Sequence, residues 1–401
     1  MRVLAALLGV LLAAGQAPAD GIRVGGYFKT FFTALDSPAP SGGLAEGIGL
    51  TRLRLNSLWN ANAYTAIELA YEVAPRIQSA AAVDGGLPQP APLSYRVADV
   101  RTRIYPVPGD PVGSFSLGHN LDRAYLVFSL PFADLQVGRQ PIAFGSARAV
   151  NPTDLIAPFT YEALDKEERI GVDALRLRLP LGAMGEVDVG LVAGDGLRAG
   201  ESAAFARSVF YVRQTDLALM ALVFKENLLL GLDAARALGG AGSWVEAGYV
   251  FAGAVGAKRG DENYLRLSAG LDCSFGSKTY GFVEYHFNGA GAGAAADYLL
   301  QLGEKAYGDG AVYLLGRHYL SPGLSYQVTP LLAATVQALV NAGDGSAFIF
   351  PRFEYSFAED VFVEAGAFLG TGPSAVAGTG VPRSEFGLYA HIYFTAVRLY
   401  F

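Results

Sequence analysis

The sequence predicts an all-β protein, a transmembrane antiparallel β-barrel of about 18 strands, with about 16 strands as the alternative. Three observations predict this fold. Polar and apolar residues alternate in many successive segments, short links alternate with long ones along the chain, and aromatic residues and glycine are abundant. The 401 residues include 21 Tyr, 24 Phe and 50 Gly. Such barrels place aromatic rings at the membrane interfaces, and glycine relieves crowding in their strands and turns.

The alternation has a period of two residues, which places neighbouring side chains on opposite faces of a strand. In residues 61–73, for example, Ile67 and Leu69 flank Glu68. The same pattern recurs in residues 264–275, 278–288 and 347–357. A series of such segments, each of about ten residues or more, is typical of a membrane barrel with one face toward lipid and the other toward the lumen.

The links between these segments come in two lengths. Tight links are expected at residues 59–61, 131–134, 276–277, 329–330 and 358–360. Long connections, rich in Gly, Pro and Ala or in charge, are expected at residues 36–47, 75–120, 145–168, 289–309 and 371–382. Short turns on the periplasmic side and long loops outside are typical of these barrels. Within residues 205–250 the strand count depends on whether the link at Gln214 is a turn.

The start of the chain predicts export. Met1-Arg2 precedes an apolar run over residues 3–15, and Ala17-Pro18-Ala19 has the small residues that signal peptidase recognises. The apolar run is shorter than the roughly 20 residues of a spanning helix. We therefore expect residues 1–19 to be a signal peptide, cleaved after Ala19, and residues 20–401 to be an outer-membrane barrel.

The last alternating segment ends on an aromatic residue. Val397, Leu399 and Phe401 share one face of it. A terminal aromatic that closes an alternating strand resembles the assembly signal recognised by the barrel-assembly machinery. The first strand is expected at Ile22, which leaves no room for a plug domain before it.

Composition and motifs argue against several other classes of protein. The net charge of −7 offers no basic stripe for nucleic acid, and the single Cys273 cannot form an intramolecular disulfide. Gly-x-Ser-x-Gly is absent, and His119, His286, His318 and His391 do not have metal-binding spacing. We therefore expect no enzymatic activity, no cofactor, no metal site and no nucleic-acid partner.

The polar phase of each segment predicts the residues that line the lumen. The candidates are Arg52, Arg54, Glu68, Glu72, Arg123, Arg139, Asp173, Arg176, Arg178, Arg266, Asp272, Glu284, Arg352 and Glu354, together with Asp233, Glu246, Glu364 and Arg398. Most of the arginines precede residue 179, and most of the carboxylates follow it. Since strand order maps onto position around a barrel, the two signs would face each other and create a transverse field. The alternative is a set of local ion pairs between neighbouring strands.

Two of these assignments need irregular strands. Arg139 falls in the lipid phase unless Gly138 forms a bulge. Arg176 and Arg178 need a change of phase near Ala174-Leu175 if Asp173 is also to face inward.

The connection over residues 145–169 is the candidate constriction, because a loop folded inward would narrow a wide lumen. Its charged candidates are Arg148, Asp154, Glu162 and Asp165. Alternatively, it is a solvated surface loop. Residues 297–305 are expected to form a short surface helix in another long connection.

Two patches of sequence resemble a known group of proteins. Residues 138–145 (GRQPIAFG) and 151–158 (NPTDLIAP) are similar to a strand and loop of Gram-negative substrate-selective porins and alginate-exporter-like barrels. The run from residues 316–320 to residues 341–346 has the same character. The resemblance implies a passive outer-membrane channel for small hydrophilic solutes, embedded in lipid and lipopolysaccharide. A homotrimer is one of the states left open, and a structural or adhesive barrel or a polysaccharide-export conduit is the alternative.

Overall fold

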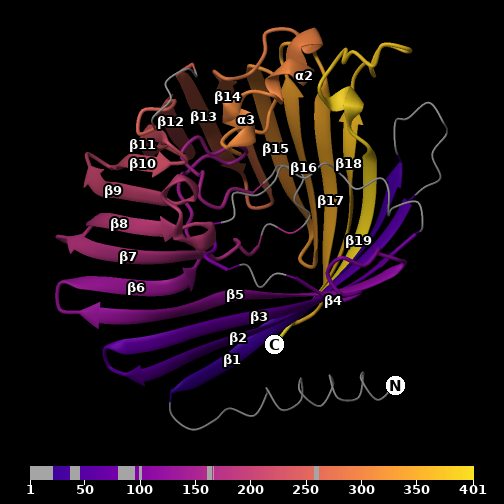
Figure 1. The fold of residues 1–401 in the computed structure, drawn as a ribbon. Coiled ribbons are helices and arrows are strands. Elements are labelled where there is room, and N and C mark those ends of the chain that lie inside the picture. The colour runs from indigo at the N-terminus through magenta and orange to yellow at the C-terminus, as the bar shows by residue number, and fades with distance from the viewer. Residues whose placement is uncertain are drawn as a thin grey trace, which may run out of the picture.

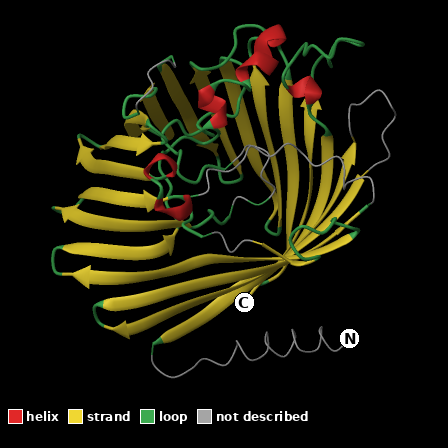
Figure 2. Cartoon of the chain, in the orientation of Figure 1, coloured by secondary structure: helices red, strands yellow, loops and turns green. Residues whose placement is uncertain are grey.

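The computed structural model describes residues 21–36, 46–79, 95–98, 102–159, 165, 167–256 and 262–401. Its strands form one antiparallel sheet that closes on itself (Figures 1 and 2), because β1 (Ile22–Asp36) pairs with both β2 (Glu46–Asn62) and β19 (His391–Tyr400). The other strands are β3 (Thr65–Gln78), β4 (Thr102–Tyr105), β5 (Phe115–Leu130), β6 (Ala133–Gln140), β7 (Val172–Leu181), β8 (Gly185–Ala193), β9 (Ala203–Val212), β10 (Thr215–Phe224), β11 (Asn227–Leu238), β12 (Ala241–Phe251), β13 (Tyr264–Phe275), β14 (Thr279–Asn288), β15 (His318–Thr329), β16 (Leu332–Asn341), β17 (Ala347–Ala358) and β18 (Val361–Thr371). The predicted signal peptide, residues 1–19, and Glu162 lie outside the described residues.

The closed ring has 18 strands, as the sequence predicts, and β4 is an extra strand outside it. β3 pairs directly with β5, and β4 pairs with the other edge of β5. The tight turns in the segment that left the strand count open include Arg213-Gln214 between β9 and β10 and Lys225-Glu226 between β10 and β11. All four residues have positive φ, as in the hairpin turns that suit twisted strands. The alternative of 16 strands is therefore wrong.

At one end of the barrel the connections are all short turns, and the longer connections gather over and within the other end, where Lys225-Glu226 is also a short turn (Figure 2). The predicted link at residues 59–61 is misplaced: β2 continues to Asn62, which pairs with Thr65, and the turn is Ala63-Tyr64. An irregularity in the pairing between Asn60 and Asn62 explains the error, because it interrupts the alternation before the strand ends.

Short helices occur in the long connections. They are 3₁₀ helices at Asp195–Leu197, Ala199–Glu201, Ala295–Asp297 and Phe386–Leu388, and α2 (Tyr298–Gln301) and α3 (Lys305–Gly308). The helix expected over residues 297–305 is thus split in two, and it is partly buried because Tyr298 is only 1% exposed. Among the described residues, no helix is both long enough and apolar enough to cross a membrane.

The inner face of β7–β13 is apolar over much of its area, contrary to the expectation of a polar lumen. Leu219 and Leu230 point outward and are exposed, whereas Met220, Leu222 and Leu229 are buried. The buried set packs against the connection between β6 and β7, so these inward side chains form a core instead of lining water. A second core over β15–β19 packs in the same way against Val150, Leu314 and Phe386 of the connections.

The wall between β5 and β7 is completed by residues outside the ring. β6 pairs with residues 124–130 of β5, whereas β4 pairs with residues 117–119, nearer the start of that strand. Residues 95–98 lie beside the start of β7, where Asp173 N donates a hydrogen bond to Tyr95 O (2.9 Å). β4 and residues 95–98 therefore continue the wall beyond the end of β6.

The assignment of Asp173, Arg176 and Arg178 to one face of β7 is wrong. β7 pairs with β6 and β8 without a register shift, so the suggested change of phase near Ala174-Leu175 is absent. Strict alternation places Asp173 on the face opposite Arg176 and Arg178.

Arg139 lies with Asp173 in the wall. The pairing of β6 with β5 is continuous through Gly138, so the bulge that would turn Arg139 toward the lumen is absent. Arg139 Nε donates to Asp173 Oδ1 (2.8 Å), its Nη1 donates to Leu121 O (3.0 Å), and Val97 N donates to Asp173 Oδ2 (2.9 Å). This pair therefore links the start of β7 to the segment that completes the wall.

Candidate constriction inside the barrel

The described residues of the connection between β6 and β7, which are 141–159, 165 and 167–171, lie inside the barrel, so for them the inward alternative is the one the structure shows. Ile142 and Leu155, at most 1% exposed, pack on the inner face of β7–β13. Gly145 has φ +91°, and a Cβ there would lie 2.5 Å from both carboxylate oxygens of Glu246. Only glycine fits this approach without strain.

Glu246 of β12 holds the first bend of the segment. Its carboxylate accepts hydrogen bonds from Ser146 N (3.1 Å), Ala147 N (3.0 Å) and Thr153 N (2.8 Å). The Thr153 hydroxyl (2.7 Å) and the Asn151 side-chain amide (3.3 Å) also donate to it. Glu246 is 0% exposed, so these donors replace the water that a carboxylate otherwise requires.

Glu284 of β14 holds the following residues in the same way. It accepts hydrogen bonds from Arg148 N (2.6 Å), Ala149 N (3.2 Å) and Val150 N (3.1 Å), and from Trp244 Nε1 (2.8 Å). Five consecutive backbone amides, from residue 146 to residue 150, thus donate to two carboxylates. Successive amides that converge on an anion form a nest, here with the anion supplied by the wall.

The carbonyl groups of the segment bind the same part of the wall. Arg266 of β13 donates to Pro152 O (3.1 Å), and Ser268 of the same strand donates to Val150 O (2.6 Å). Ser268 Oγ lies 2.8 Å from His286 Nδ1, a pairing that hydrolases also use. Both side chains are buried and the hydroxyl is engaged by the carbonyl, so this pair anchors the segment.

The later part of the segment binds basic residues on the opposite wall. Lys29 of β1 pairs with Asp165 (3.1 Å) and Glu167 (2.5 Å), and Arg52 of β2 pairs with Asp165 (2.6 Å). Arg54 and Arg123 lie 3.5 and 3.4 Å from Glu168. β12 follows β2 by nine places in the 18-strand ring, so the described parts of the segment contact opposite walls.

This arrangement changes the meaning of the charge asymmetry in the sequence. Arg52, Arg54 and Arg123 do contact carboxylates of the segment, and two of the late wall carboxylates, Glu246 and Glu284, accept hydrogen bonds from its amides. The charged candidates also pair within the wall. Pairs between neighbouring strands, as in the alternative hypothesis, are Arg176–Asp188 (2.6 Å), Arg178–Glu186 (2.7 Å), Arg52–Glu72 (2.6 Å), Arg352–Glu364 (3.6 Å) and Arg398–Glu364 (3.1 Å). Arg54–Asp122 (2.6 Å) and Arg398–Glu354 each join strands that are two places apart in the ring. Glu68 accepts a hydrogen bond from Tyr125 (2.6 Å).

The sequence analysis did not identify some residues of this network, among them Lys29 and Asp122. Lys29 carries a visible signal, since it is a cation in the middle of a strand, between the aromatic pairs Tyr27-Phe28 and Phe31-Phe32. Asp122 does not, because it faces the same side as Arg123 only through a bulge in β5 opposite Ala70 and Tyr71. Phe401, the predicted assembly signal, extends the closing seam: Gly26 N donates to Phe401 O (2.8 Å).

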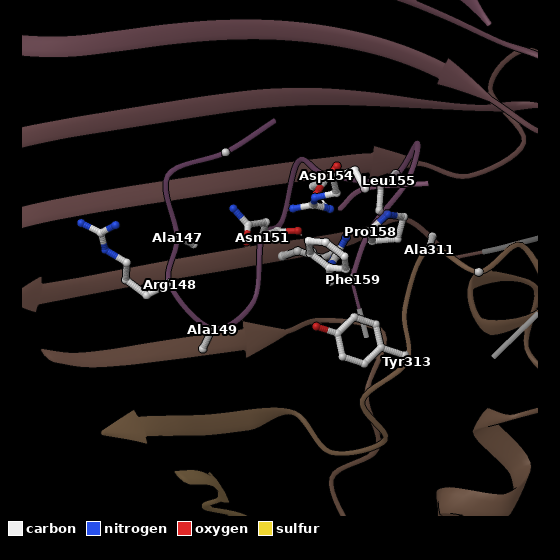
Figure 3. A pocket seen from close by; sticks show the side chains of 14 residues that line it. Ala147, Arg148, Ala149, Asn151, Asp154, Leu155, Pro158, Phe159, Ala311 and Tyr313 are labelled. Carbon is white, nitrogen blue, oxygen red and sulfur yellow. Dashed lines mark hydrogen bonds and ion pairs between the residues drawn. The ribbon is translucent and has the colours of Figure 1, made fainter. Parts of the chain in front are cut away.

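Two cavities meet at Arg148. One of about 240 Å³ lies on the side of the long connections and reaches Tyr313 (Figure 3). The other, of about 510 Å³, reaches Gln214 and Ala237 near the short turns. Gly145 and Ala147 border both cavities as well. The part of the segment that the wall carboxylates hold therefore separates an outer space from an inner one.

Arg148 points away from the other labelled polar side chains of its cavity (Figure 3). Its guanidinium lies 5.2 Å from the Trp244 ring, and Nη2 donates to Asp272 (3.0 Å). The side chain is 51% exposed, so it presents a positive charge at the junction of the two cavities.

The smaller cavity carries further charge. Asp154 pairs with Arg169, whose guanidinium lies 4.2 Å from the Phe159 ring and donates to Ala157 O (2.7 Å). Burial raises the pKa of Asp154. With Arg148 and Arg266 also in the lining, basic residues outnumber acidic ones.

A closed antiparallel barrel with an apolar outer face and a segment folded inward has the architecture of a transmembrane β-barrel. OccAB3 of Acinetobacter baumannii has this fold, with a TM-score of 0.58 at 10% identity over 95% of this chain and 99% of that one. The outer membrane protein OpdK of Pseudomonas aeruginosa gives 0.56 at 8% identity, over 96% of this chain and 100% of OpdK. OpdK in a structure with vanillate gives 0.55 at 9% identity, over 95% of this chain and 98% of that one.

No protein-family model and no curated protein sequence matches the chain.

Proposed function

We propose that this protein is an outer-membrane channel of the porin type, through which small hydrophilic solutes diffuse without energy input, cofactor or chemical conversion. The observation that carries this proposal is the segment pinned inside the closed barrel, with a cavity on each side of Arg148. A purely structural or adhesive barrel gains nothing from buried carboxylates that hold a loop across its lumen. The apolar outer face and the predicted signal peptide support a place in the outer membrane, in contact with lipid and lipopolysaccharide, after insertion by the barrel-assembly machinery.

The charge of the smaller cavity supports a preference for anions. Arg148, Arg169 and Arg266 line it against the single carboxylate of Asp154. Arg266 donates to carbonyl groups, so its charge is not cancelled by an acid in this lining. A solute with one carboxylate would meet a positive field on the outer side of Arg148.

Planar-bilayer recording tests the channel directly. We expect discrete conductance steps from the purified, folded protein, and a reversal potential in a potassium chloride gradient that shows chloride to be favoured. Arg148→Gln should reduce that preference, whereas Arg198→Gln should not. The control Arg198 is an exposed arginine in the connection between β8 and β9, paired with Asp195.

Vanillate suits a block experiment, because OpdK was solved with it. Circular dichroism and heat-dependent gel mobility would show that the protein is folded. If folded protein gives no conductance, the alternative of a structural or adhesive barrel is favoured.

A further inference from the structure

We infer that Glu246 and Glu284 are positioning residues that set the width of the constriction. They act through the backbone of residues 146–153 and do not need to touch the solute. The inference rests on the proposed channel function, since it names the residues that determine which solutes pass.

The first argument is geometric. The segment could be held by side chains alone, yet its consecutive amides from 146 to 150 all converge on these two carboxylates. A carboxylate has lone pairs for about four hydrogen bonds, so both groups are filled by the segment and by Trp244. Hydrogen bonds to a charged group are stronger than neutral ones, and they fix the backbone path, whatever side chains the segment carries.

The second argument comes from packing. Gly145 lies so close to Glu246 that a side chain at this position would collide with both of its oxygens. Ser146 Oγ also donates to Asp233 of β11, so the bend is held from two adjacent strands. The segment therefore has little room to shift toward the wall while Glu246 remains in place.

The third argument comes from the cavities. Gly145, Ala147 and Arg148 border both spaces, and the amides of residues 147 and 148 donate to the two carboxylates. A shift of this backbone moves the boundary between the cavities and carries Arg148 with it. Glu246 and Glu284 thereby determine both the width of the constriction between the two cavities and the position of the Arg148 charge.

The test measures the size of neutral polymer that enters the channel. Glu246→Gln and Glu284→Gln each replace an acceptor oxygen by an NH₂ group that faces backbone donors, so the segment should loosen. We expect a higher single-channel conductance and entry of larger polyethylene glycols than in the wild type. Thr153→Val removes only the hydroxyl donor to Glu246 and should change both quantities in the same direction, to a smaller extent.

Glu364→Gln is the matched control. Glu364 is a buried wall carboxylate of β18, but it pairs with Arg352 and Arg398 of the neighbouring strands. Its substitution removes the same charge from the lumen wall, so it should alter ion selectivity and leave the polymer cut-off unchanged.

A second readout does not require conductance. In a Cys273→Ser background, Ala149→Cys should react several-fold faster with a charged maleimide when Glu284→Gln is also present. Faster labelling with no conductance from any variant, the wild type included, would support the positioning role and refute the channel. The inference is overturned if Glu246→Gln and Glu284→Gln fold but keep the wild-type values of both quantities, the polymer size cut-off and the rate of maleimide labelling.

Discussion

Among single residues, Glu385 has a carboxyl group whose protonation depends strongly on the fold. It lies in the connection between β18 and β19, is 0% exposed, and accepts hydrogen bonds from Leu315 N (2.8 Å), Asn341 Nδ2 (2.8 Å) and Tyr319. Its own amide donates to Asp344 (2.8 Å). Burial, with a smaller contribution from the nearby Asp344, raises the pKa of Glu385 from 4.5 to about 7 against the opposing effect of these donors. The group therefore ties three connections together at the outer end of the barrel.

A pH dependence follows from this shift. Between pH 4.5 and about 7 the folded protein binds more protons at Glu385 than the unfolded chain does. The free energy of unfolding contributed by this group is thus fully present below pH 4.5 and is lost as the pH rises through about 7. Hydrogen exchange of the amides of residues 315–319, corrected for intrinsic rates, should show more protection at low pH than at high pH. Glu385→Gln should remove the difference, and protection that increases with pH would contradict the assignment.

At the scale of elements, the strands could be predicted but the faces of several could not. Alternation locates a strand because lipid selects apolar residues on every second position. It assigns the inner face only where that face meets water, and Leu222 and Phe224 of β10 meet the constriction segment instead. The pairing of residues far apart in sequence, such as Lys29 with Glu167, leaves no periodic trace.

The Arg139–Asp173 ion pair, which stabilises the wall between β5 and β7, gives a prediction at the scale of elements. Arg139→Ala leaves the carboxylate of Asp173 in the wall without its cation, which should cost about 3–5 kcal/mol of unfolding free energy. Arg139→Ala combined with Asp173→Ala removes both charges and should cost less than the single Arg139 substitution. Urea unfolding in lipid vesicles, followed by tryptophan fluorescence, measures both. If the single and double variants lose the same free energy of unfolding, the ion pair does not stabilise this part of the wall.

At the scale of the whole molecule, the class of barrel, the strand number and four of the five expected tight links could be predicted from the sequence. The residues of the candidate constriction could be predicted, but not whether they fold into the lumen, because an inward loop and a surface loop can have the same composition. The residues that decide are on the wall that the loop meets: Glu246 and Glu284 accept hydrogen bonds from its backbone amides, and an apolar inner face packs against its apolar side chains. That complementarity exists only once the ring has closed.

The orientation of the barrel in the membrane gives a prediction at the same scale. The connection between β18 and β19 has an exposed tip around Val376 and Gly378. An epitope inserted after Gly378 should be labelled on intact cells, since exposed tips tolerate insertions. The same epitope in the Gly239-Gly240 turn, at the other end, should be labelled only after the outer membrane is permeabilised. The reverse pattern would mean that the long connections face the periplasm.

The segment between β6 and β7 also has a mechanical consequence. A ring of hydrogen-bonded strands resists stretching along its circumference, but it can flatten without breaking any bond of the ladder. A member attached to opposite sides opposes that flattening, as a strut does in a tube. Its attachments differ in kind: hydrogen bonds to buried carboxylates at Glu246 and Glu284, and ion pairs to Lys29 and Arg52 on the other side. Ion pairs with partly exposed partners weaken in salt more than buried hydrogen bonds do. As the salt concentration rises, the barrel should therefore lose its resistance to flattening first along the diameter that ends at β1 and β2.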